Sequence, residues 1–205
     1  WMDGGDGEYS NDVASQYYVQ ALKGLIDAYI EKNGDIDMNR IYIGGCSNGG
    51  FMTVNMIFNF PDFFAAAYPI CEAYPTGDVS AEKVEKIKDL PVWFTHSAND
   101  NTVKIATNGE PDDVYTNALY IDLINAGAEN VHYSMFETVT VEGVNYDGHW
   151  SWIYVLRDEC VNVQPTAGAN GDMTIADLDP ASAEKVQVGG ENVTLWGWLA
   201  AQSKA

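Results

Sequence analysis

The chain has 205 residues, 46% of them hydrophobic, and a formal net charge of −20. This length and composition predict one packed domain rather than a disordered chain, and the negative charge argues against nucleic acid or anionic lipid as partners. No apolar run approaches the roughly 20 residues that a membrane-spanning helix needs.

In chain order, the apolar residues alternate between helical and strand patterns. The first helix carries apolar side chains at helical spacing from Val19 to Ile30, with Ser10 or Asn11 as its cap and Asn33-Gly34 as its stop signal. The expected strands are 40–43, 64–71, 91–95 and 131–136, and the later helices are 51–60, 80–89, 112–126, 151–157 and 195–202. Strands separated by helices predict parallel pairing and an α/β fold.

The least regular part is 161–191, which is rich in Gly, Ala and Asp. Within it, Asn170-Gly171-Asp172 with Asp177 and Asp179 only faintly suggests a calcium loop. The first ligand position lacks an acidic residue, and Met173 stands where the turn glycine belongs. We therefore predict no metal site there.

The three cysteines, Cys46, Cys71 and Cys160, match no zinc-binding spacing. We expect Cys46 and Cys71 to be small buried residues at strand ends. A disulfide between these two residues remains an alternative, since the strands that carry them are candidates for neighbours.

Ser47 lies in the stretch IYIGGCSNGGFMT (residues 41–53), between an expected strand and an expected helix. Gly45 and Gly49, two residues before and two after, permit the tight turn that lifts a serine above a sheet edge. Because a serine hydroxyl is a weak nucleophile until a base takes its proton, this pattern predicts a nucleophile elbow that needs a partner base. A plain glycine-rich turn is the alternative. The Asn48 N–H, at the helix start, would point where an oxyanion forms.

Of the three histidines, His149 best fits the base. It follows Gly148 in a loop between the last strand and a helix, and loops at strand ends carry much of the chemistry in α/β folds. His132 lies within a strand and is expected to be structural. His96 ends the strand 91–95 and is expected to brace the following loop.

Asp100 is the acid that we expect to orient His149. It follows the strand 91–95, and each chain segment that separates it from Ser47 and from His149 is long enough for about one or two strand–helix units. All three groups can therefore reach the same edge of the sheet. Asp147 is a rival acid, but it is too close in sequence to His149 to reach the far ring nitrogen easily. Asp78 is a second rival, on the wrong strand.

Together these features resemble the α/β-hydrolase superfamily, and more narrowly its feruloyl esterase and polyhydroxybutyrate depolymerase-like esterases, with relatives among prolyl-oligopeptidase-like hydrolases. The stretches that carry the resemblance are DIDMNRIYIGGCSNGGFM, FAAAYPICEA, LPVWFTHSANDNTV and GHWSWIY, within residues 35–154. The chain order Ser, Asp, His is also that of this superfamily. The resemblance implies a mostly parallel sheet flanked by helices, with Ser47 as nucleophile, Asp100 as acid, His149 as base and Asn48 as an oxyanion donor.

One departure concerns the N-terminal part of that fold. Enzymes of this superfamily have several strands before the elbow strand, and a loop among them supplies the second oxyanion donor; here one helix precedes the elbow. The beginning, Trp1 to Gly7, is typical of an internal loop rather than of a signal or transit peptide. We expect residues 1–205 to be the C-terminal portion of a single catalytic domain, completed by a preceding segment or, less favoured, by a second chain.

The resulting hypothesis is a serine esterase that forms an acyl-enzyme intermediate and needs no cofactor or metal. Glu72, Tyr74 and Trp150 are expected to line its pocket, and an aromatic wall suits feruloyl esters, or acetyl esters, of plant polysaccharide. The substrate is therefore a small-molecule or polysaccharide-linked ester. By resemblance we expect an extracellular or cell-surface location. The alternatives are a prolyl-oligopeptidase-like peptidase and a catalytically dead binding protein on the same fold.

Overall fold

The computed structural model describes residues 16–105, 115–165 and 173–204. The helices are α1 (Gln16–Lys32), α2 (Asn48–Asn59), α3 (Ala81–Ile87), α4 (Tyr115–Asn125), α5 (Trp152–Leu156) and α6 (Leu195–Ala201). The strands are β1 (Tyr42–Cys46), β2 (Ala66–Ile70), β3 (Val92–Ser97), β4 (Val131–Phe136), β5 (Val139–Val141), β6 (Val144–Tyr146), β7 (Gln187–Val188) and β8 (Glu191–Asn192). Single 3₁₀ turns cover Thr76–Asp78, Gly148–Trp150 and Ile175–Asp177.

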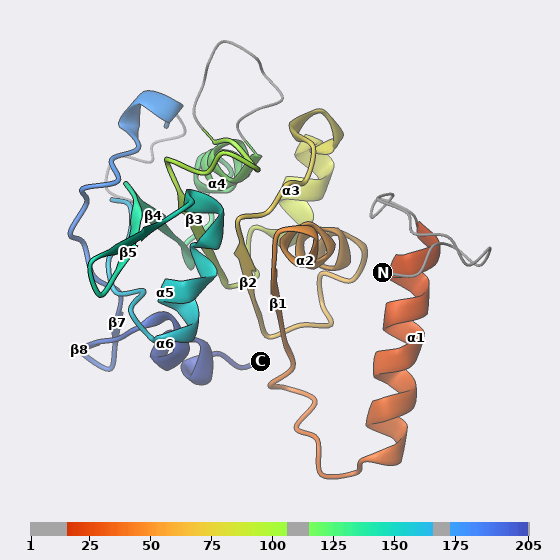
Figure 1. Cartoon of the computed structure of the whole chain (residues 1–205). Coiled ribbons are helices and arrows are strands. Elements are labelled where there is room, and N and C mark those ends of the chain that lie inside the picture. The colour runs from red at the N-terminus through yellow and green to blue at the C-terminus, as the bar shows by residue number, and fades with distance from the viewer. Residues whose placement is uncertain (1–15, 106–114, 166–172, 205) are drawn as a thin grey trace.

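The four strands β1 to β4 form one parallel sheet in chain order (Figure 1). A helix between consecutive strands carries the chain back across the sheet, so each strand starts at the same edge. The carboxyl ends of all four strands therefore meet at the opposite edge, where ligand sites of open α/β sheets lie. This arrangement confirms the predicted α/β fold.

Two apolar clusters cover the two faces of the sheet. Successive strand residues point to opposite faces, so Val92 and Phe94 pack with α2, α3 and α4, whereas Trp93 packs with α5 and α6. Figure 1 shows α5 and α6 together on one side of the sheet and α2 to α4 on the other. Trp93 and Trp198 meet edge to face at 5.5 Å, which joins α6 to the middle of the sheet.

The first helix packs only partly as its periodicity predicts. Val19 is fully buried, and Leu22 and Ile26 pack against the larger cluster, but Leu25 is 67% exposed and Tyr29 is 62% exposed. The reason is that α1 lies outside α2 (Figure 1) and, within the described residues, packs mainly on that helix, so only part of its surface is covered. Its expected caps, Ser10 and Asn11, lie outside the described residues.

Two short hairpins were missed by the sequence reading. In β5–β6, Glu142 and Gly143 both have positive φ, and in β7–β8 the turn is made by Gly189 and Gly190, also at positive φ. Two central residues with positive φ match the right-handed twist of a two-residue hairpin. The Glu-Gly and Gly-Gly pairs were the available signals.

The predictions for the cysteines and for the calcium-like loop are tested only in part. All three cysteines are free, and Cys46 is exposed rather than buried, since it ends a strand that has no second neighbour among the described residues. Asp177 and Asp179 accept backbone N–H groups of Thr174 and Ala181. Asn170 to Asp172 lie outside the described residues.

In the part of the chain that the structure describes, no helix has both the length and the apolar character that a membrane crossing requires.

Candidate active site

Ser47 occupies a strained turn between β1 and α2. Its φ of 58° and ψ of −120° are rare for a residue with a side chain. The turn is held at both ends, because the Ser47 N–H donates to the Ile70 carbonyl at 3.0 Å and the Ser47 carbonyl accepts from the Phe51 N–H at 2.9 Å. The strain is therefore fixed by the sheet on one side and the helix on the other.

Glycine at two positions permits this close approach. A Cβ on Gly45 would lie 2.8 Å from the Gly49 carbonyl group, and a Cβ on Gly50 would lie 2.6 Å from the Ile70 carbonyl oxygen. A Cβ on Gly49 would meet nothing within 4 Å. The crowded glycines are thus Gly45 and Gly50, whereas the sequence pattern singled out Gly45 and Gly49.

The structure brings Ser47, His149 and Asp100 together at the carboxyl edge of the sheet. His149 Nε2 lies 3.0 Å from the Ser47 hydroxyl oxygen, and His149 Nδ1 lies 2.8 Å from Asp100 Oδ2. An ionised carboxylate only accepts hydrogen bonds, so Nδ1 carries the proton and Nε2 is free to accept the serine proton. This is the tautomer that a general base needs.

The surroundings of Asp100 keep its carboxyl group ionised. Its side chain is buried, and Oδ1 accepts the N–H groups of Thr102 and Val103 at 2.8 Å each. Burial by itself would raise the pKa of the Asp100 carboxyl, but the hydrogen bonds from His149, His96 and the Val103 N–H outweigh it and hold that pKa well below its usual range. A permanent negative charge therefore faces His149.

The loop of His149 contacts the loop of Asp100 closely. A Cβ on Gly148 would collide with the backbone of Asn99 and Asp100. Asp147, the rival acid, accepts the His149 N–H at 2.9 Å and the Asn101 amide N–H at 2.8 Å. Asp147 thus ties the two loops together instead of contacting the imidazole ring.

The other two histidines, His96 and His132, differ from His149 in their contacts and in their position in the sheet. His96 is fully buried and contacts Asp100 Oδ2 at 3.1 Å and the Val103 carbonyl at 2.9 Å, so it braces the loop as expected. His132 lies at the amino end of β4, paired in register with Trp93, and so at the sheet edge opposite the triad.

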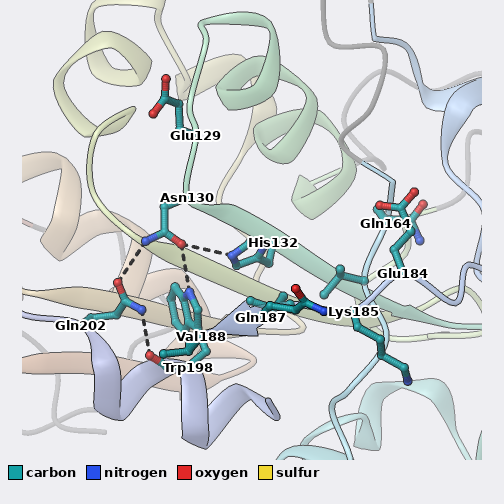
Figure 2. Close-up of a pocket in the computed structure, with 12 residues that line it drawn as sticks. Glu129, Asn130, His132, Gln164, Glu184, Lys185, Gln187, Val188, Trp198 and Gln202 are labelled. Carbon is teal, nitrogen blue, oxygen red and sulfur yellow. Dashed lines mark hydrogen bonds between the residues drawn. The ribbon is translucent and has the colours of Figure 1, made fainter. Parts of the chain in front are cut away.

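Around His132 is a polar pocket of about 340 Å³ (Figure 2). Figure 2 shows Asn130 on one side of it, hydrogen-bonded to His132, Trp198 and Gln202. Burial lowers the pKa of His132 to about 4, so the ring is neutral near pH 7 and packs against the tryptophans as the sequence reading expected for a structural residue.

Asn48 is the first residue of α2. The first N–H groups of a helix have no intrahelical partner, and they carry the positive end of the helix dipole. Such an N–H group suits an oxyanion donor, and this role for Asn48 stays a prediction.

Two of the three expected pocket residues are inside the protein. Glu72 is completely buried, and the Tyr74 ring packs between Phe51 and Phe58 at 5.0 and 5.2 Å. Glu72 and Tyr74 therefore present little surface to solvent, and their place in a substrate pocket stays a prediction. The chain after β2 turns in under the start of α2 instead of outward, and a Cβ on Gly50 would nearly touch Glu72.

Trp150, the third, is 46% exposed beside His149. Its ring stacks between Tyr146 and Trp152, each at 5.6 Å, and Trp152 meets the His149 ring edge to face at 5.5 Å. Trp152 was missed by the sequence reading, although its place three residues after His149 in a short helical turn was a usable signal.

Comparisons with known proteins agree with this fold. Residues 8–106 match the prolyl oligopeptidase family. A stretch of 70 residues is 36% identical to poly(3-hydroxyalkanoate) depolymerase C of Paucimonas lemoignei, covering 34% of this chain and 16% of that protein. A thermostable esterase of known structure has a TM-score of 0.62 and 28% identity, over 92% of this chain and 38% of its own.

A second structural relative is the acylaminoacyl peptidase of Pyrococcus horikoshii, with a TM-score of 0.51 and 16% identity over 68% of this chain and 26% of its own. This likeness concerns the fold alone. The chain spans less than two fifths of the length of each of these relatives. With a parallel sheet, a strained serine between strand and helix, and these similarities, the chain has the α/β-hydrolase fold and is similar to proteins of that superfamily.

Proposed function

We propose that this protein is a serine hydrolase that cleaves carboxylic esters through an acyl-enzyme intermediate. The observation that carries the proposal is the continuous hydrogen-bonded line from Ser47 through His149 to Asp100, with distances of 3.0 and 2.8 Å. Both lie within the reach that proton transfer between a nucleophile and its base requires.

The geometry supports a two-step reaction. Ser47 Oγ attacks the ester carbonyl while His149 Nε2 takes its proton, and the Asn48 N–H receives the developing oxyanion. His149 then returns the proton to the leaving alcohol. Water, activated by His149 in turn, attacks the acyl-enzyme and restores Ser47. Asp100 stabilises the imidazolium in both steps because it remains ionised.

An ester substrate is favoured over a peptide by two resemblances. The structural relative with the higher identity is an esterase, and the relative from Paucimonas lemoignei is named as a depolymerase of a poly(hydroxyalkanoate), a polyester. The match to the prolyl oligopeptidase family keeps a serine peptidase as the second candidate.

For the substrate we propose aryl or sugar-linked esters, such as feruloyl or acetyl groups on plant polysaccharide. The support is the exposed aromatic stack of Tyr146, Trp150 and Trp152 next to His149, since aromatic rings and pyranose faces pack well on such surfaces. A polysaccharide substrate would place the protein outside the cell or at its surface, and fractionation of the producing cells tests that location.

A fluorophosphonate probe tests the catalytic part of the proposal. Mass spectrometry should find the probe on Ser47 in the native protein and no labelling in a Ser47→Ala variant. A native protein that stays unlabelled while it remains folded would favour the alternative of a catalytically dead binding protein.

A substrate panel tests the rest. We expect turnover of p-nitrophenyl acetate, methyl ferulate and acetylated xylan, with Trp150→Ala lowering kcat/KM for methyl ferulate more than for p-nitrophenyl acetate. Turnover of short aliphatic esters alone would exclude the feruloyl and acetyl-xylan proposal. Faster release from proline-anilide peptides than from any ester would instead identify a peptidase.

A further inference from the structure

The most unusual buried group outside the triad is the carboxyl of Glu72. It is completely buried; Oε2 accepts the Tyr74 N–H at 2.6 Å, whereas Oε1 has no partner of normal hydrogen-bond geometry. Burial raises the pKa of Glu72 to about 7, against the lowering effect of the Tyr74 N–H and of the nearby Thr116 hydroxyl. Burying a carboxyl that becomes charged near neutral pH costs folding free energy. The residues that contact Glu72 therefore indicate what the group could do.

Thr116 connects this carboxyl to the triad. The Thr116 hydroxyl is fully buried, lies beside Glu72, and is 2.9 Å from His96 Nδ1. On its other side the His96 ring reaches Asp100 through Nε2, at 3.1 Å from Oδ2. Glu72, Thr116, His96 and Asp100 thus lie in one buried series that ends on the same carboxylate oxygen that His149 contacts; its first step, from Glu72 to Thr116, is a close approach without a formed hydrogen bond.

The hydrogen positions along this series follow from which groups can accept. His96 Nε2 faces only acceptors, the Asp100 carboxylate and the Val103 carbonyl, so Nε2 carries a proton in every state. In a neutral His96, Nδ1 must then accept, and the donor is the Thr116 hydroxyl. With its only proton committed to His96, Thr116 can accept a hydrogen bond from a protonated Glu72 but cannot donate one to an ionised Glu72.

We propose that Glu72 is a positioning residue for the ester hydrolysis proposed above, acting on Asp100 through Thr116 and His96. When Glu72 is protonated, Thr116 donates to His96 Nδ1, and His96 donates firmly to Asp100. When Glu72 loses its proton to solvent, the Thr116 hydroxyl rotates toward the carboxylate, and His96 Nδ1 loses its donor.

Loss of the Thr116 hydrogen bond makes the His96 Nε2–H a weaker hydrogen-bond donor. A neutral imidazole whose Nδ1 no longer accepts a hydrogen bond is less polarised, so its Nε2–H donates more weakly to Asp100. Asp100 Oδ2 then accepts more strongly from His149. Together with the added negative charge, this stabilises the His149 imidazolium that forms as Ser47 attacks.

The charged and titratable groups around Glu72 are consistent with this single ionisation. Tyr133 on β4 lies near Glu72 and Asp100, and its ring contacts that of Tyr120 on α4. Burial raises the pKa of both hydroxyls, so neither titrates near neutral pH. Asp100 is ionised throughout. On the side of α3, the Lys83 ammonium is occupied by the Tyr74 hydroxyl and the Asp78 carbonyl.

Histidine NMR tests the coupling without any need for activity. The chain has three histidines, and His132, with its pKa lowered to about 4, serves as an internal reference between about pH 5 and about pH 9. We expect the His96 Nδ1 resonance of the native protein to move with a midpoint near the Glu72 pKa of about 7. In Glu72→Gln, whose amide imitates the protonated carboxyl, that movement should be lost.

Two further variants complete the test. Thr116→Val keeps the side-chain volume but removes the relay hydroxyl, so His96 should again stop responding; it also serves if Glu72→Gln does not fold. Glu82→Gln, an exposed glutamate paired with Lys86, is the matched control and should leave the native curve unchanged. A His96 curve in Glu72→Gln and Thr116→Val that superimposes on the native one would overturn the proposal.

The kinetic consequence is measured separately. The kcat/KM ratio of Glu72→Gln to native protein on p-nitrophenyl acetate should be close to one below about pH 6 and should fall as the pH rises through about 7. A ratio that stays constant with pH would overturn the link to catalysis. If no ester is hydrolysed at all, the NMR result still decides whether Glu72 controls His96, so this failure is distinguishable from failure of the proposed function.

Discussion

The elbow offers a sharp comparison between two neighbouring glycines. Alanine at position 50 would place its Cβ 2.6 Å from the Ile70 carbonyl oxygen, while alanine at position 49 would meet nothing within 4 Å. Ordinary van der Waals contact begins at 3.4 Å, so Gly50→Ala must push α2 and the end of β2 apart by roughly 0.8 Å. The Ile70 carbonyl is also the acceptor of the Ser47 N–H, and the displacement therefore reaches Ser47, the proposed nucleophile.

The expected size of the effect follows from this shift. A misplacement of about 1 Å in an active site lowers the rate by about 100-fold, so Gly50→Ala should lower kcat/KM by about 10- to 100-fold. Overpacking should also lower the free energy of unfolding by about 1–3 kcal/mol. Gly49→Ala should instead raise that free energy by about 0.5–1 kcal/mol, because alanine suits a helix better than glycine, and its activity should change little.

Esterase assays on p-nitrophenyl acetate measure kcat/KM of both variants, and urea unfolding measures their free energy of unfolding. The activity comparison uses only protein that urea unfolding shows to be native. Equal activity in the two variants, or a larger loss in Gly49→Ala, would refute the reasoning from Cβ contacts and favour the glycine spacing of the sequence pattern.

Three further predictions concern single side chains. Ser47→Ala should lower ester turnover by at least about 10⁴-fold with an unchanged unfolding midpoint; residual activity within tenfold of native would assign the nucleophile elsewhere. Asp100→Asn should lower kcat by about 10⁴-fold, since an amide can stabilise the wrong tautomer of His149, and near-native kcat would contradict the role of Asp100. The raised Glu72 pKa of about 7, against 4.5 for an ordinary glutamate, predicts a stability contribution that is complete below about pH 4.5 and is lost as the pH rises through about 7, about 3 kcal/mol in all. Urea unfolding across this range should show that loss in native protein and not in Glu72→Gln, and parallel curves for the two would contradict it.

Local chain signals were enough to predict the parallel sheet and the meeting of Ser47, Asp100 and His149. Ser47 stands between a short strand and an apolar helix, Asp100 follows the strand with Trp93 and Phe94, and His149 follows a glycine in a loop. Each of these signals is contained within a few residues. Parallel strands joined by helices then bring their carboxyl ends to one edge, which is a consequence of topology and not of detailed packing.

What surrounds those groups was decided only by the tertiary structure. Whether the Glu72 side chain is exposed or buried depends on how closely α2 approaches the end of β2, and the sequence carries no signal for that distance. The same holds for His96, whose contact with Asp100 depends on the path of the intervening loop. The sequence shows which side chains are apolar and how they are spaced. The burial and hydrogen bonding of a polar side chain depend instead on partners from distant segments. Such partners exist only once the chain has folded.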